Sequence, residues 1–285
     1  MNLFHVQWLK LILGVLIPFG IYRYREILIE SFYYATQMKL SILFTFLFVL
    51  ISISLVSIRL KYLIKKQGGL IKFWTAFKCY FISLSPIFSM IRFSDSIKIY
   101  YLKKKGILLS QAMTAYLSEL IIGIFVTGVM LAVFLGQYTP FLFIALSLVI
   151  ISALLLIKFS HKLPNFRILN IIRDFSEDLK KIIKVKIIFT LLLISFTQFV
   201  FDVFALSTAT GASLAQSLIA VLIGIGVITA APTIAGIGFY ETAVPAFLIS
   251  IGISSEAAVG GVFVYRFFTL WLPALIGNFL LHKEF

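Results

Sequence analysis

Long apolar runs recur along the whole chain, and they constrain its fold more than any other feature. A bilayer-spanning helix needs about 20 mostly apolar residues, and runs of this kind follow one another from Leu3 to Leu281. Of the 285 residues, 61% are hydrophobic and 13% are charged, whereas soluble domains average roughly 45–50% and about 25%. A soluble fold cannot bury so much apolar surface. The sequence therefore predicts an all-α, polytopic integral membrane protein with a single membrane domain over residues 1–285.

About eight transmembrane helices are expected. We place them at residues 3–22, 40–58, 109–135, 140–157, 186–207, 213–231, 236–251 and 258–281. A further apolar stretch, residues 73–91, lies between two basic loops.

The distribution of Lys and Arg predicts how the chain crosses the membrane. Basic loops are expected at 59–72, 92–105 and 158–186, while the turns near Gln137, Thr210 and Ser254 contain no Lys or Arg. The positive-inside rule makes the basic loops cytoplasmic. Spans that cross the cell membrane in alternation then place both termini in the cytoplasm. The net charge of +14 is explained by anionic lipid headgroups rather than by nucleic acid.

Residues 73–91 cannot cross the membrane once if both flanking loops are cytoplasmic. We interpret them as one re-entrant segment, which requires protein or water around its backbone at membrane depth. The alternative is a buried or interfacial helix.

Several ionisable residues fall inside the expected spans, where each costs roughly 2.5–3.5 kcal/mol on insertion scales and is a functional candidate. They are Glu119, Asp202, Glu241 and Arg266, with Lys78 in the 73–91 stretch. Arg266 is expected within reach of any of the three acids, and a buried ion pair that only joins two helices is the alternative. Three acids against two bases leave at least one carboxylate without a basic partner, which is then protonated or binds a cation.

The segment 231–245 contains several residues that weaken a helix. Pro232, Gly236 and Gly238 lie at its start, and Pro245 lacks the amide that would bond the carbonyl of Glu241. Discontinuous helices of this kind line binding sites in transporters. Packing alone also explains Gly and Pro in membrane helices.

These residues resemble the end of a known family. The pattern consists of Pro232-Thr233, Gly236-Ile237-Gly238, Glu241, Gly252-Ile253, Tyr265-Arg266, Trp271, Pro273 and Gly277. It is similar to the lysylphosphatidylglycerol synthase transmembrane region family, also called flippase-like domain proteins. The chain departs from the family at Ile234 and Ala235, where Pro and Gly are usual.

An earlier stretch is similar to the same family. It consists of Pro86, Ser94-Asp95, Lys98, the run from Tyr100 to Gly106, and Glu119. Lys98 stands where Arg is usual, Leu120 replaces the Arg that usually follows Glu119, and Arg59 with Lys61 matches a further basic position.

The resemblance implies a lipid-handling protein. In the best-known members, a similar membrane unit is joined to a soluble aminoacyl-transfer domain and moves aminoacylated phosphatidylglycerol between leaflets. We see no transferase domain in these residues and expect no enzyme activity and no cofactor. The expected function is that of a flippase or scramblase, which moves a phospholipid or lipid-linked headgroup through an internal polar cavity. Without an ATP-binding P-loop, transport would be passive or ion-coupled.

Candidate substrate-binding residues are Arg266, Glu241, Glu119, Asp202, Pro232, Gly236, Gly238, Tyr265, Lys98 and Lys78. Arg266 would contact phosphate, since guanidinium matches it with a bidentate fork, and the acids would contact a cationic or hydroxylated headgroup. The expected partners are membrane lipids, either anionic or modified, and not nucleic acid. A homo-oligomer is an open alternative. The alternatives are a membrane enzyme or accessory protein for lipid-linked substrates, and an ion-coupled or small-solute transporter.

Overall fold

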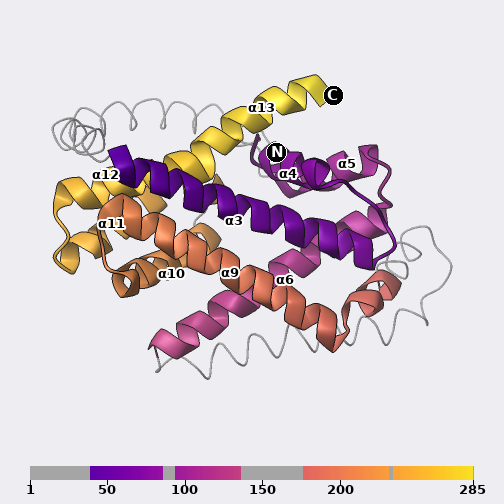
Figure 1. Ribbon diagram of the computed structural model, residues 1–285, viewed down its shortest axis with the longest axis horizontal. Coiled ribbons are helices and arrows are strands. Elements are labelled where there is room, and N and C mark those ends of the chain that lie inside the picture. Colours follow the sequence, from indigo (N-terminus) through magenta and orange to yellow (C-terminus); the bar gives the residue numbers. More distant parts are fainter. Residues whose placement is uncertain (1–38, 86–93, 136–175, 231–233, 285) are drawn as a thin grey trace, which may run out of the picture.

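A computed structural model describes residues 39–85, 94–135, 176–230 and 234–284. These ranges are helical with short connections and contain no strand (Figure 1). The predicted all-α fold class is therefore confirmed for the part of the chain that the structure describes.

The helices follow one another along the chain. They are α3 (Lys39–Lys66), α4 (Phe73–Leu84), α5 (Ser94–Lys104), α6 (Leu109–Leu135), α9 (Val185–Thr210), α10 (Leu214–Ala230), the short 3₁₀ turn η3 (Ile234–Gly236), α11 (Tyr240–Ser250), α12 (Ser255–Arg266), the π-helical segment η4 (Phe267–Trp271) and α13 (Leu272–Glu284).

Four described helices are long and apolar enough to cross a membrane. They are Lys39–Lys66, Leu109–Met130, Val185–Thr210 and Ser255–Glu284, the last formed by α12, η4 and α13 in one run. Large apolar side chains such as Phe189, Leu193 and Phe279 point away from the interior and are 66%, 56% and 69% exposed. Lipid tails cover such side chains in a membrane protein.

The expected total of eight spans stays a prediction. The spans at 3–22 and 140–157 lie outside the described residues. The span expected at 236–251 corresponds to α11, which has 11 residues and a length of about 16 Å, roughly half of a bilayer core. The basic loop expected at 59–72 is partly wrong, because α3 continues to Lys66 and keeps Arg59 within the helix.

Basic side chains gather at one end of the bundle, which we call the basic end. It contains Lys65 and Lys66 at the end of α3, Lys103 and Lys104 at the end of α5, and Lys283 near the end of α13. Figure 1 shows α9 starting at this end and running back beside α3 to the opposite end, where α10 starts and α11 is linked to α12.

Two hairpins of shorter helices meet at η4. One is formed by α4 and α5 from the basic end, and the other by α10 and α11 from the opposite end (Figure 1). Helix α10, which has 17 residues, corresponds to the span expected at 213–231. Leu84 at the end of α4, and Ala235 and Ile237 in the turn before α11, all pack against Leu270 and Ala274 of the last span. The sequence predicted re-entrance only for 73–91, of which residues 86–91 lie outside the described residues.

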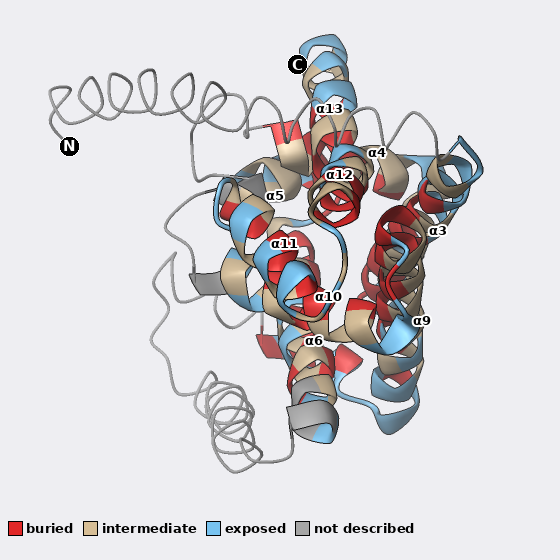
Figure 2. Ribbon diagram, turned by 90° about the vertical axis from the view of Figure 1, so that its left-hand side faces the viewer, coloured by how far each residue is buried: buried red, intermediate tan, exposed pale blue. Residues whose placement is uncertain are grey.

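The last span lies very close to α4. A Cβ built on Gly277 would lie 1.9 Å from the carbonyl oxygen of Phe81, so only glycine fits there. Figure 2 shows buried residues on the inner faces of these helices and exposed ones on their outer faces. The close approach fixes α4 against the span that carries η4.

Gly277→Ala is therefore expected to destabilise the protein by about 1–3 kcal/mol, because the methyl group overlaps a backbone atom that cannot move alone. Thermal unfolding in detergent measures the change. Gly123→Ala is the matched control, since a Cβ there meets nothing within 4 Å and alanine raises helix stability by about 0.5–1 kcal/mol. Equal thermal unfolding midpoints for Gly277→Ala and Gly123→Ala would contradict the close packing of Gly277 against α4.

Candidate functional site

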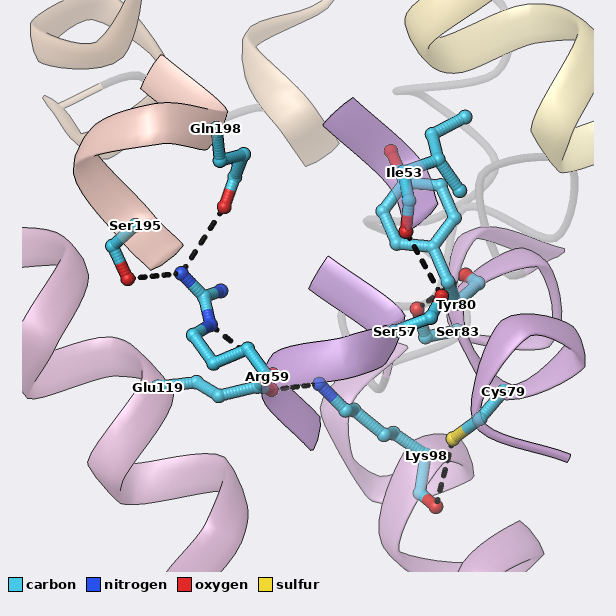
Figure 3. Close-up of polar contacts among 10 residues, drawn as sticks. All are labelled: Ile53, Ser57, Arg59, Cys79, Tyr80, Ser83, Lys98, Glu119, Ser195 and Gln198. Atoms are coloured by element: carbon cyan, nitrogen blue, oxygen red, sulfur yellow. Dashed lines mark hydrogen bonds and ion pairs between the residues drawn. The ribbon is translucent and has the colours of Figure 1, made fainter. Parts of the chain in front are cut away.

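Three ionised side chains from α3, α5 and α6 form a buried group, the Arg59 cluster, consisting of Arg59, Lys98 and Glu119 (Figure 3). Arg59 Nε lies 3.5 Å from Glu119 Oε1, and Lys98 Nζ pairs with Glu119 Oε2. The three side chains are 7–12% exposed. Two bases share one acid, so the cluster has a net charge of +1 when all three residues are ionised.

The Arg59 guanidinium continues the hydrogen bonding onto α9. Its Nη1 donates to Ser195 Oγ at 2.9 Å and to Gln198 Oε1 at 3.1 Å, as Figure 3 shows. Each of these acceptors is uncharged. Arg59 therefore joins the ion pair on α6 to a polar face of α9.

Asp202 lies one turn further along α9. Ser52 Oγ on α3 donates to its Oδ1 at 2.7 Å, and Gln198 lies within hydrogen-bonding reach of the same carboxylate. A row of polar side chains thus runs from the Arg59 cluster toward the opposite end. We call it the polar network, and it consists of Ser52, Arg59, Lys98, Glu119, Ser195, Gln198 and Asp202.

A second group, the Arg266 cluster, forms where the tip of the α10–α11 hairpin meets the last span. It consists of Ala235, Tyr240, Glu241 and Arg266. Arg266 Nε donates to Glu241 Oε1 at 2.8 Å, and its Nη2 donates to the carbonyl oxygen of Ala235 at 2.9 Å. The guanidinium also lies 4.5 Å from the centre of the Tyr240 ring. Arg266 is 4% exposed and Glu241 is 27% exposed, so the acid is the accessible side of the pair.

The turn that carries Glu241 depends on left-handed backbone. Ala235, Gly236 and Gly238 have φ values of 51°, 68° and 85°. Glycine adopts such values freely, whereas a residue with a Cβ pays roughly 1–2 kcal/mol. The Gly238 amide donates to Glu241 Oε2 at 2.8 Å, so the carboxylate also satisfies the start of α11. The tight turn forms here despite the alanine at position 235.

Three tyrosines, Tyr80, Tyr240 and Tyr265, lie in the Arg266 cluster or on the elements beside it. The rings of Tyr240 and Tyr265 stack with centres 6.4 Å apart, and Tyr80 Oη donates to the carbonyl oxygen of Thr269 in η4 at 3.4 Å. All three tyrosines are within electrostatic range of both Asp202 and Arg266. Asp202 and Arg266 therefore both lie near the three tyrosine rings.

The sequence matches the family described as the lysylphosphatidylglycerol synthase TM region over residues 7–277, nearly the whole chain. The chain belongs to this family. Comparison with curated proteins gives no match. Membership of the lysylphosphatidylglycerol synthase TM region family, together with the long apolar helices, shows a membrane protein of the flippase-like, lipid-related type.

The structure brings together five of the candidate residues that carried the family resemblance. Glu241, Arg266, Gly236, Gly238 and Tyr265 lie in or beside the Arg266 cluster. The other candidates separate into three groups. Glu119, Lys98 and Asp202 lie in the polar network, Pro232 lies outside the described residues, and Lys78 lies apart at the basic end, 3.4 Å from Glu284.

Sequence reasoning missed the uncharged members of the polar network and gave Arg59 no role in the site. Ser195, Gln198 and Asp202 are spaced i, i+3 and i+7, which places them on one face of α9. Ser52 and Arg59 have the same seven-residue spacing on α3. Polar residues at helical spacing around a membrane acid were the signal that could have found them. Within the described ranges, no group of three or more His, Cys, Asp or Glu could hold a metal ion.

Proposed function

We propose that this protein moves a phospholipid or lipid-linked headgroup between the leaflets of the cell membrane, with its basic end and both termini in the cytoplasm. The observation that carries the proposal is the presence of two charged groups, the polar network and the Arg266 cluster, inside an apolar helical bundle. Ionisable side chains cost free energy inside a membrane, and those that are found there are functional candidates. A headgroup would follow them while its tails stay in the bilayer.

The Arg266 cluster supports a particular mode of headgroup binding. Arg266 is already paired with Glu241 through Nε, so a phosphate that binds the guanidinium through a fork that includes Nε takes the place of the carboxylate. An ammonium group on the same headgroup would then neutralise Glu241. A zwitterionic or aminoacylated lipid carries both a phosphate and an ammonium group. It replaces the Arg266–Glu241 ion pair with two ion pairs, phosphate with Arg266 and ammonium with Glu241, so each buried charge stays compensated.

A small-solute or ion transporter is the second candidate, favoured by the carboxylate of Asp202. No ion pair joins it to a Lys or Arg in the part of the chain that the structure describes. Ion flux through proteoliposomes without movement of lipid would favour this candidate.

Purified protein in liposomes is expected to speed the exchange of labelled lipids between leaflets. The panel contains anionic, aminoacylated and glycosylated lipids, and the loss of fluorescence on adding an impermeant quencher measures exchange. Liposomes without protein, and liposomes with an unrelated helical membrane protein, are the controls. If no lipid in the panel moves faster than in both controls, the proposal is wrong.

A further inference from the structure

Asp202 differs from the other two acids of the interior. Glu119 pairs with Arg59 and Lys98, and Glu241 pairs with Arg266. Asp202 instead accepts a hydrogen bond from the neutral Ser52. It lies eight residues before the end of α9, about 12 Å from that end at 1.5 Å per residue, and is therefore well inside the apolar part of the helix.

The groups around Asp202 suit a proton better than a metal cation. Ser52 donates its hydroxyl hydrogen to the carboxylate. The carbonyl oxygen of Gln198 is engaged by Arg59, which leaves the amide nitrogen of Gln198 to face Asp202. Hard cations such as Ca²⁺ and Mg²⁺ take six or more oxygen ligands. Hydrogen-bond donors around the carboxylate cannot serve as ligands of a metal cation, whereas a proton needs only one carboxylate oxygen.

The titratable and charged groups near Asp202 come from several elements. They are Arg59 on α3, Tyr80 on α4, Tyr240 on α11, and Tyr265 and Arg266 on α12, while α10 contains no titratable residue and Glu119 on α6 is reached through Arg59. Arg266 and Glu241 balance one another.

The charge of the polar network therefore depends on Asp202. With Arg59, Lys98, Glu119 and Asp202 all ionised, its charges sum to zero. Protonation of Asp202 leaves the network with a charge of +1, contributed by the Arg59 cluster. In a low-dielectric interior, an uncompensated positive charge attracts an anion strongly.

We propose that Asp202 is a proton-binding site, and that proton uptake there makes the polar network cationic and couples it to binding of an anionic lipid headgroup. The inference rests on the proposed function, and it identifies the proton as the ion that is coupled to lipid movement. The proton comes from water and forms an O–H bond with a carboxylate oxygen of Asp202, and the bound headgroup supplies the compensating negative charge. Because linkage is reciprocal, an anionic headgroup also tightens proton binding.

The first test follows exchange of an anionic lipid in proteoliposomes as a function of pH. The rate is expected to rise as the pH falls, by up to about tenfold per pH unit, which is the limit for one linked proton. Asp202→Asn is neutral at every pH and is expected to abolish this dependence while keeping the rate that the unmodified protein reaches at low pH. Glu177→Gln, an exposed acid, is the matched control and keeps the pH profile. Replacing Na⁺ with choline is expected to change nothing.

A second readout does not depend on transport. Infrared spectra of the purified protein in lipid are expected to show a carboxylic acid band that grows as the pH falls and is lost in Asp202→Asn but not in Glu177→Gln. If the band is present and no lipid moves, the proposed function fails and the proton site stands. If lipid moves but Asp202→Asn retains the pH dependence, or exchange requires Na⁺, the proton site is wrong.

Discussion

Replacing Glu119 with alanine is expected to destabilise the protein by about 3–5 kcal/mol, the cost of leaving buried charges without a partner. Glu119 is the acid that both Arg59 and Lys98 contact in the Arg59 cluster. Its removal leaves two bases with a net charge of +2 among side chains that are 12% exposed or less. Thermal or denaturant unfolding in detergent measures the loss. Glu177→Ala removes an exposed acid and is expected to have a small effect.

A second substitution shows that charge, and not side-chain volume, causes the loss. Lys98→Met removes one of the two bases and keeps a long apolar side chain. Added to Glu119→Ala, it is expected to recover part of the lost stability, because one uncompensated charge remains instead of two. Neighbouring residues that share a partner show such non-additive effects of about 0.5–3 kcal/mol. Additive effects of the two substitutions would mean that the Arg59 cluster is not held together by its charges.

The long helices and the interior charges were predictable from the sequence because both follow simple rules. Apolar runs near 20 residues specify helices, and the spans expected at 40–58, 109–135 and 186–207 lie within α3, α6 and α9. The half-length helices were not predictable in the same way. The run 236–251 has the composition of a span, but left-handed backbone at Ala235, Gly236 and Gly238 turns the chain before α11 begins.

Partners of the interior charges were less predictable than the charges themselves. Side chains reach only a few ångströms, whereas an uncertainty of four residues in a helix boundary moves a charge by about 6 Å. The sequence therefore left Arg266 open to three acids, of which the structure selects Glu241. Arg59 was assigned to a loop because the expected span ended at residue 58, although α3 continues to Lys66. Leu84, Ala235 and Ile237 meet at η4 through tertiary packing that no local pattern contains.

Arg266→Ala is expected to reduce lipid exchange to the level of liposomes without protein. The substitution removes the group proposed to bind phosphate, and it also frees Glu241 and the carbonyl oxygen of Ala235, which Arg266 holds at 2.8 and 2.9 Å. Each lost hydrogen bond to a charged group costs about 1.5–3 kcal/mol, so loss of activity alone does not separate binding from folding. Lys283→Ala removes an exposed base from the same span and is expected to leave exchange unchanged.

Two further variants separate the two roles of Arg266. Arg266→Lys keeps the charge but has no fork to reach both Glu241 and Ala235, so it is expected to fold and to exchange lipid at an intermediate rate. Arg266→Gln with Glu241→Gln removes both charges together, which avoids a buried unpaired charge. This double variant is expected to unfold near the temperature of the unmodified protein and still to move no lipid. Exchange at the normal rate in the double variant would show that the Arg266 cluster only holds the hairpin tip in place. Loss of exchange in a stably folded double variant would assign the pair to headgroup binding, because its structural contribution would then have been removed without loss of the fold.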